Sequence, residues 1–283
     1  MFPPKNILFP VDFSDRCRGG GRLVEIFAGH FEAEITMLHV VEPPTYSDIA
    51  IDTTPAAEAE LARYMSEEMK HFTVRRVLTH GDAASRIADY ANSGRFDLVM
   101  MPTHGYGGFR RLMLGSVTAR VLDHVNCPVC TGVHMEDVPV LEKIQMRNVL
   151  CAVDLGTQSC AALSMAARMA EDFSATLTIA HALEAATAAA AGGGGAAHDP
   201  DWRVEVTRDV KKRIADLQES TGTQSAHVII GAGDPPRVVH EASEETHADL
   251  VVIGRSVRQG VLGRLRANAY SIVRQSPCPV LSV

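Results

Sequence analysis

Short apolar runs alternate along the chain with longer segments whose apolar residues recur at helical spacing. In the first half, the runs that predict strands are Asn6–Val11, Glu34–Val41, the segment with Val74, Val77 and Leu78, then Asp97–Met101 and Pro128–Val133. The helical pattern covers Asp15–Phe31, Leu61–Phe72, Ala83–Ala91 and Ser116–Val125. This alternation predicts a doubly wound α/β fold, with a five-stranded parallel sheet flanked by helices on both faces. Such folds bind ligands at the carboxyl ends of the strands, where the winding reverses.

The second half of the chain repeats the first. Matching segments follow in the same order: NILFPVD at 6–12 and NVLCAVD at 148–154, Gly81-Asp82 and Gly233-Asp234, and the triplet Cys-Pro-Val at 127–129 and 278–280. Ordered matches at a nearly constant separation predict two tandem copies of one domain, at residues 1–140 and 146–283.

Composition and charge indicate which kinds of binding partner the chain is expected to have. The 283 residues include 27 Lys and Arg against 34 Asp and Glu, a formal net charge of −7, with no basic tract. We therefore expect no nucleic-acid partner. No apolar run approaches the ~20 residues needed to cross a bilayer, which predicts no membrane association. The six scattered cysteines are typical of a reducing compartment, so the expected location is cytoplasmic.

The segment from Met101 to Ser116 carries the most informative chemistry. A predicted strand enters a loop containing glycine, and Gly115-Ser116 opens a predicted helix. Free backbone N–H groups and the positive end of a helix can hold an anion there, while Ser116 can cap the helix and offer its hydroxyl. The spacing alone fits an ordinary loop with a serine cap equally well.

Several segments together resemble a universal stress protein domain. They are Ile7–Ser14 (ILFPVDFS), Leu38-His39-Val40, Thr103-His-Gly105 followed by Gly115-Ser116, and Cys127-Pro-Val129. The resemblance spans nearly all of both copies. It implies the adenine nucleotide alpha hydrolase-like fold, and two domains that pair within one chain through their last strands, Pro128–Val133 and Pro279–Val283. A further homodimer is left open.

The resemblance also implies a ligand, which is ATP or another adenine nucleotide, with or without Mg²⁺. The family's adenine-side contacts fall on Pro10, Asp12 and Val40, with Met101 beside the loop, and its phosphate-side contacts fall on Gly105, Gly115, Ser116 and Val117. One residue departs from the family pattern G-x2-G-x9-G-S/T, because Pro102 replaces the first glycine. Proline has no N–H to donate, so we expect weaker or altered binding.

The second copy departs further from this pattern. It keeps Gly254, but Val257 replaces the second glycine and Ala267-Asn268 replaces Gly-Ser. The added side chains fill space that phosphates need, so we predict no ATP in this copy and a structural role for it. The nearby arginines 255, 258, 264 and 266 could form another anion site, although exposed loop charge is usually only solvated.

Other motifs favour structural roles. His39 and His181 end predicted strands, where a histidine is more often a satisfied core residue than a catalyst. Cys127 and Cys130 have C-x-x-C spacing but fall in the last predicted strand, which favours burial over redox or zinc chemistry. No base, nucleophile or carboxylate pair is identifiable at the loop, so we expect no catalytic and no metal-ligating residues. The alternatives to nucleotide binding are an interaction scaffold and, last, a slow ATPase.

Overall fold

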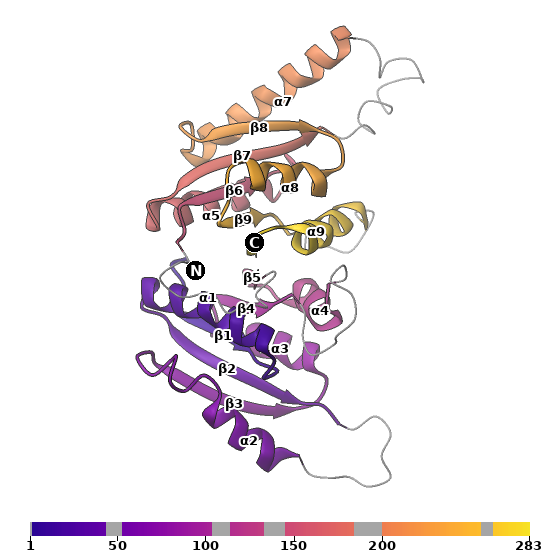
Figure 1. Ribbon diagram of the computed structural model, residues 1–283. Helices are drawn as coiled ribbons and strands as arrows, with labels where there is room; N and C mark the ends of the chain where they lie inside the picture. Colours follow the sequence, from indigo (N-terminus) through magenta and orange to yellow (C-terminus); the bar gives the residue numbers. More distant parts are fainter. Residues whose placement is uncertain (1, 44–52, 104–113, 133–144, 184–199, 256–262) are drawn as a thin grey trace. The chain divides into compact units, whose positions relative to one another are not determined.

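The computed structural model describes residues 2–43, 53–103, 114–132, 145–183, 200–255 and 263–283. The chain divides into two compact units, Met1–Gln145 and Met146–Val283. Each unit passes through strands and helices in the same order, as Figure 1 shows along the colours of the chain. The duplication seen in the sequence is therefore a duplication of the fold.

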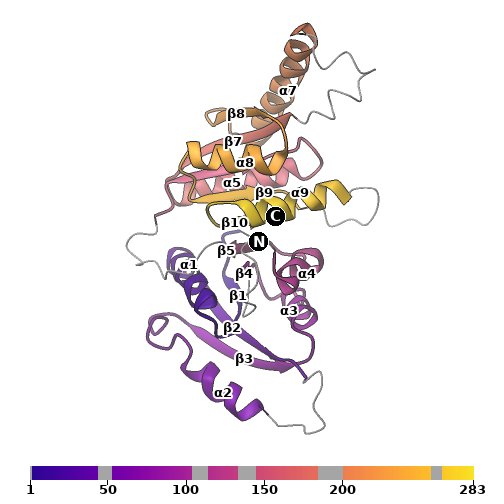
Figure 2. The ribbon, with the colours of Figure 1, turned by 45° about the vertical axis from the view of Figure 1, so that its right-hand side comes forward.

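The first unit is built on a parallel sheet. Its described elements are β1 (Asn6–Pro10), α1 (Asp15–Phe31), β2 (Glu34–Val41), α2 (Thr54–Arg63), β3 (Val74–His80), α3 (Ala83–Ala91), β4 (Leu98–Pro102), α4 (Ser116–His124) and β5 (Val129–Gly132). The strands lie in the order β3-β2-β1-β4-β5, and each neighbouring pair is parallel. Helix α1 lies on one side of this sheet, and α3 and α4 lie on the other (Figure 2).

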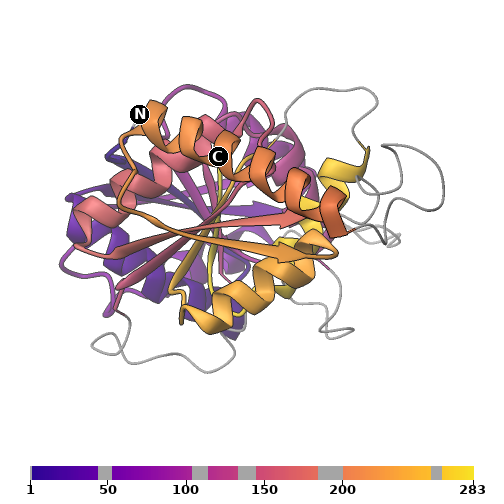
Figure 3. The same cartoon turned by 90° about the horizontal axis from the view of Figure 1, so that it is seen from above.

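The second unit repeats this arrangement. Its described elements are β6 (Asn148–Ala152), α5 (Ser159–Asp172), β7 (Thr176–Leu183), α7 (Pro200–Thr221), β8 (His227–Ala232), α8 (Pro235–Glu245), β9 (Leu250–Ile253), α9 (Gly263–Gln275) and β10 (Val280–Ser282). The strand order is β8-β7-β6-β9-β10, again with parallel neighbours. Figure 3 shows α5 and α7 on one side of the strands and α8 on the other.

These observations confirm the predicted fold class. In each unit the strand order reverses direction next to the first strand, between β1 and β4 and between β6 and β9. Ile7, Leu8 and Phe9 of β1 are fully buried because helices cover both faces of the sheet. The expected pairing of the units through their last strands stays a prediction.

In each unit, the side chain of one aspartate forms hydrogen bonds that link the amino ends of two central strands. Oδ2 of Asp97 accepts hydrogen bonds from the backbone N–H groups of Lys5 and Asn6, at 3.0 and 3.1 Å. Asp249 does the same for Arg147 and Asn148, at 2.8 and 2.9 Å. Strand β4 begins at Leu98, directly after this aspartate and one residue later than the apolar pattern predicts.

The helical expectation over Leu61–Phe72 is wrong beyond Arg63. Tyr64 leaves the helical region with ψ at 122°, and Met65 has a left-handed φ of 50°. The following residues form turns, in which Met65 and Met69 are almost completely buried. The apolar spacing in this segment therefore reflects burial of a turn and not a continuous helix.

The expectation that Cys127 and Cys130 both lie buried in the last strand is correct only in part. Strand β5 begins at Val129, so Cys127 precedes it and is partly exposed, while Cys130 is a buried strand residue. The predicted burial thus holds for Cys130 only. Separately, none of the described helices has the length and hydropathy required to cross a membrane.

The tight contact between β8 and α8 gives a test of this packing. A Cβ added at Gly231 would lie 2.6 Å from Cγ1 of the buried Val238, whose branched side chain has little freedom to move. Gly231→Ala should therefore lower the free energy of unfolding by about 1–3 kcal/mol, measured by urea denaturation.

A matched control is Gly29→Ala in α1. Its added Cβ would meet Phe72 at an ordinary 3.5 Å, and alanine favours a helix over glycine by about 1 kcal/mol. Stability should be unchanged or slightly higher in this variant. Equal destabilisation by both substitutions would contradict the packing described here.

Candidate functional site

The candidate site lies at the carboxyl edge of the first sheet. Pro10, the last residue of β1, is in register with Leu38 of β2, so Val40 extends along the same edge. Strand β1 pairs with β4 through Leu8 and Val99. Pro10 ends β1 and Met101 is the penultimate residue of β4, so both lie at the carboxyl ends of these neighbouring strands, with Asp12 two residues beyond β1. Four of the predicted contact residues, Pro10, Asp12, Val40 and Met101, therefore come together at one edge; Pro10 and Met101 are buried, whereas Asp12 and Val40 are partly exposed.

Asp12 is held by a tight turn. Its Oδ1 accepts hydrogen bonds from the backbone N–H and the hydroxyl of Ser14, at 3.0 and 2.6 Å. Ser14 is the N-cap of α1, since its Oγ accepts a bond of 3.1 Å from the N–H of Cys17. Both of these hydrogen bonds use Oδ1, and the thiol of the buried Cys17 is a further neighbour of the carboxylate. The carboxylate therefore supports the helix cap through one oxygen and can receive a ligand through the other.

An aromatic group packs against this turn. The ring of Phe13 stacks on that of His39 at 4.2 Å, and Tyr64 approaches Phe13 edge-on at 5.3 Å. Nδ1 of His39 lies 2.8 Å from the carbonyl oxygen of Val11. His39 is thus a structural residue of the strand edge, as its position at the end of a strand suggested.

The base of the loop between β4 and α4 closes onto the same edge. The N–H and Oγ1 of Thr103 both donate to the carbonyl of Gly132, and the N–H of Gly115 donates to the carbonyl of Thr103 at 3.0 Å. Residues 104–113, which include the predicted contact Gly105 together with His104, Arg110 and Arg111, lie outside the described residues. The two described ends of the loop nevertheless meet, through the hydrogen bond between Gly115 and Thr103.

Helix α4 begins at this loop, but Ser116 is not its cap. Gly115 is the N-cap, with φ −59° and ψ 142°, and no side chain caps the helix. Ser116 is the first helical residue and is exposed, while Val117 is partly exposed. The first N–H groups of a helix have no carbonyl partner within it. The N–H of Gly115 is used by the carbonyl of Thr103, so Ser116 and Val117 present their backbone N–H groups, and Ser116 its hydroxyl, at a positive helix end.

Arg120 anchors α4 to the neighbouring helix, a role that the sequence did not predict. It binds both carboxylate oxygens of Asp82, at 2.7 and 2.8 Å, and Asp82 is itself the N-cap of α3. Hydrogen bonds from Arg120 and Ser85 lower the pKa of the Asp82 carboxyl. The aligned Gly-Asp pairs marked this turn as common to both units, but nothing in their spacing indicated the arginine.

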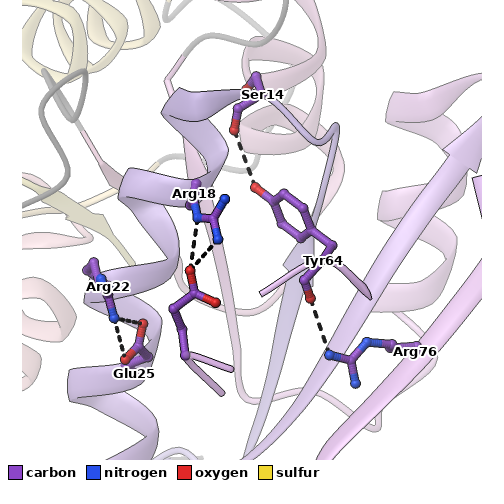
Figure 4. Close-up of polar contacts among 7 residues, drawn as sticks. Ser14, Arg18, Arg22, Glu25, Tyr64 and Arg76 are labelled. Carbon is purple, nitrogen blue, oxygen red and sulfur yellow. Dashed lines mark hydrogen bonds and ion pairs between the residues drawn. The ribbon is translucent and has the colours of Figure 1, made fainter. Parts of the chain in front are cut away.

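Two arginines of α1 form ion pairs, one with the segment after α2 and one within α1 itself (Figure 4). Arg18 binds Glu68 with two of its nitrogens, and Arg22 binds both carboxylate oxygens of the buried Glu25 at 3.0 and 3.1 Å. Burial raises the pKa of Glu25 despite the opposing effect of Arg22. Nearer to Asp12, burial and the Asp12 charge raise the pKa of the Cys17 thiol to about 12, so Cys17 stays protonated.

The second unit has a similar turn in different surroundings. Oδ1 of Asp154 accepts from the N–H of Gly156 at 2.8 Å and from the hydroxyl of Ser159 at 2.9 Å. Gly254 lies directly against the turn that precedes α5, because a Cβ there would be 2.8 Å from Cβ of Gln158. Val257 and Arg258 lie outside the described residues.

Fold and site together define a class, a duplicated doubly wound α/β protein whose strand order reverses beside the first strand of each unit. The model of the universal stress protein family matches residues 3–131 and 146–283. The chain therefore belongs to the universal stress protein family, with two such domains in tandem. This confirms the family and the duplication predicted from the sequence.

Known relatives agree with this assignment. A universal stress protein of Methanocaldococcus jannaschii is 27% identical over 135 residues, which cover 44% of this chain and 79% of the relative. Another, from Synechocystis, is 32% identical over 44% of this chain and 83% of its own length. The crystal structure of a universal stress protein from Archaeoglobus fulgidus covers 99% of this chain and 98% of its own, with a TM-score of 0.74 and 23% identity. The last comparison concerns the fold alone.

Because of the Asp82–Arg120 pair, we expect the stability of the protein to depend on pH. Because the pKa of Asp82 is lowered on folding, the pair stabilises the protein above the unfolded value of about 3.8, and this contribution declines as the pH falls further. Arg120→Ala should lower the melting temperature at pH 7, and the difference from the wild type should shrink below about pH 4.

Lys70→Ala is the control, since Lys70 forms only an exposed pair with Glu67 at 3.5 Å. Its effect should be small. A difference for Arg120→Ala that stays constant from pH 7 to about pH 3 would contradict this role of Asp82.

Proposed function

We propose that the first unit binds an adenine nucleotide, ATP foremost, at the carboxyl edge of its sheet, and that the second unit is mainly structural. Nucleotide binding would serve stress response or signalling, in keeping with the family. Pairing of the two units through their last strands belongs to the same proposal. We propose that the protein binds the nucleotide without catalysing a reaction.

One observation carries this proposal, namely that the Asp12 turn after β1 and the segment from β4 to α4 both follow the carboxyl ends of the two strands between which the strand order reverses. Phosphate oxygens are suited to the N–H groups at the start of α4, because the helix end is positive and Gly115 adds no side chain there. Oδ2 of Asp12 can accept a hydrogen bond from a hydroxyl or amino group of the nucleoside. Val40, partly exposed on β2, offers an apolar contact to the base. The residues thus fit a ligand with one anionic and one apolar end.

Mg²⁺, when bound with the nucleotide, would neutralise part of the phosphate charge. The exposed hydroxyl of Ser116 is the oxygen that this chain offers at that end of the site. The negative net charge of the whole protein does not oppose such binding, because backbone N–H groups attract an anion without a charged side chain.

The second unit supports a different role. Its counterpart of Gly115-Ser116 by sequence is Ala267-Asn268, and these residues lie inside α9, which begins at Gly263, and not at the start of a helix. The contact between Gly254 and Gln158 also brings the loop after β6 directly against the end of β9. This unit keeps the strand order and the turn at Asp154, so a structural role is compatible with its fold.

Pro102 favours a second candidate, an interaction scaffold that binds no nucleotide. Proline at the end of β4 has no N–H for a phosphate or base. However, the carbonyl of Pro102 accepts a bond of 3.2 Å from Oγ1 of Thr118, so Pro102 still helps to fix the start of α4. We therefore favour nucleotide binding over the scaffold.

Isothermal titration with ATP and Mg²⁺ tests the proposal. The N-cap Gly115 has a backbone conformation that any residue can adopt, so Gly115→Val should fold and should fail only in binding. The added side chain occupies the space between the helix end and the phosphates, and we expect affinity to fall by at least about tenfold, the equivalent of losing one or more charge-assisted hydrogen bonds.

Ala267→Val, at the position of the second unit that aligns with Gly115 by sequence and lies inside α9, is the control. Its affinity for ATP should equal that of the wild type. Unchanged binding by Gly115→Val would rule out this site, whereas no binding by the wild type would favour the scaffold.

A further inference from the structure

The turn that carries Asp12 contains a residue in an unfavourable backbone conformation. Phe13 has a φ of 64°, in the left-handed region that residues other than glycine rarely adopt. Such a conformation costs free energy and persists only where surrounding contacts compensate for it. Because Phe13 lies between Asp12 and the helix cap Ser14, these contacts also decide where the Asp12 carboxylate points.

Tyr64 provides two of these contacts from a distant part of the sequence. Its hydroxyl donates a hydrogen bond of 3.3 Å to the carbonyl oxygen of Ser14, as Figure 4 shows. Its ring meets the ring of Phe13 edge-on, on a stack completed by His39. Tyr64 thus holds the turn at both Phe13 and Ser14.

Tyr64 is itself fixed in place at the end of α2. Arg76 of β3 donates to the carbonyls of Leu61 and Tyr64, at 2.9 and 3.2 Å. The next residue, Met65, is buried against Gly21 of α1, where a Cβ would collide with the thioether. Three residues further on, Glu68 binds Arg18 of α1. The tyrosine is therefore a rigid support and not a loosely held surface side chain.

In the second unit, a different side chain supports the left-handed turn after the first strand. Leu155 follows Asp154 with a left-handed φ of 57°, and its carbonyl accepts a bond of 3.1 Å from Arg213 of α7. Helix α7 follows the second strand of its unit, as α2 does in the first. In both units, a side chain from this connection donates to a carbonyl of the strained turn.

We infer that Tyr64 is a positioning residue for nucleotide binding, which holds the Asp12–Ser14 turn so that the Asp12 carboxylate faces the ligand. The inference rests on the proposed function of the first unit. The hydroxyl of Tyr64 acts on Ser14, and Ser14 holds Oδ1 of Asp12 with its N–H and its hydroxyl. Oδ2 is thereby kept at a fixed place for the nucleotide.

The contact is present throughout the physiological pH range. Burial and the neighbouring Cys17 raise the pKa of Tyr64, so its hydroxyl stays protonated and able to donate. Other charged or titratable groups near it are Asp12 and Arg18.

Tyr64→Phe in the full-length protein tests the inference, because it removes the hydroxyl and keeps the ring against Phe13. We expect the dissociation constant for ATP, measured by titration calorimetry, to rise about three- to tenfold, as for the loss of one neutral hydrogen bond. Amide hydrogen exchange over residues 12–18 should become faster without nucleotide. The melting temperature should change little, which separates a positioning effect from general destabilisation.

Tyr90→Phe is the matched control, since Tyr90 lies on α3 at the opposite face of the sheet. It should change neither affinity nor exchange at 12–18. If the wild type binds ATP and Tyr64→Phe binds it equally well, the positioning role is overturned and the proposed function stands. If the wild type binds no adenine nucleotide, the proposed function fails and the positioning role fails with it.

Discussion

The left-handed residue after the first strand of each unit is the constraint on which the candidate site depends. A chain that leaves β1 along the sheet must turn sharply to begin α1 on one face, and Phe13 makes that turn at φ 64°. The turn places a carboxylate on one side of this residue and a helix cap on the other, so that Ser14 can donate a hydrogen bond to Asp12. Leu155 makes the same turn in the second unit. Neither residue is glycine, so both turns need support from elsewhere in their units.

The two units differ in chemistry while their framework stays the same. The framework interactions are repeated: Asp97 and Asp249 fasten the starts of the strands, and His39 and His181 each lie 2.8 Å from the carbonyl before the strand-end aspartate. The phosphate-side residues Gly115 and Ser116 are not repeated, since their counterparts by sequence are Ala267 and Asn268, whereas Asp12 recurs as Asp154. Substitutions at the phosphate end of the site can therefore occur in a unit without destabilising its sheet.

Much of this arrangement could be predicted from the sequence. Buried parallel strands produce continuous apolar runs, and the order of matched segments indicated the duplication, so the fold class and the bounds of α1 and β2 follow from pattern alone. The helix predicted through Phe72 shows where pattern fails. Met65 and Met69 are apolar because they pack in turns against α1, and burial at such spacing has no unique secondary structure. Tyr64 and Arg120 were missed for a related reason, since their partners Ser14 and Asp82 lie far away in sequence.

Pro102 shows why the fold and the site must be judged separately. As the last residue of β4, it needs no further backbone N–H for the sheet, and its carbonyl receives Thr118. Helix α1 packs beside it without crowding, since even a Cβ added at Gly20 would lie at an ordinary 3.9 Å from the proline nitrogen. The fold therefore accepts proline at this position without strain. What proline removes is a single donor at the entrance of the loop, while the donors at the start of α4 remain. Any effect of Pro102 should accordingly appear in the affinity for a ligand and not in the stability of the first unit.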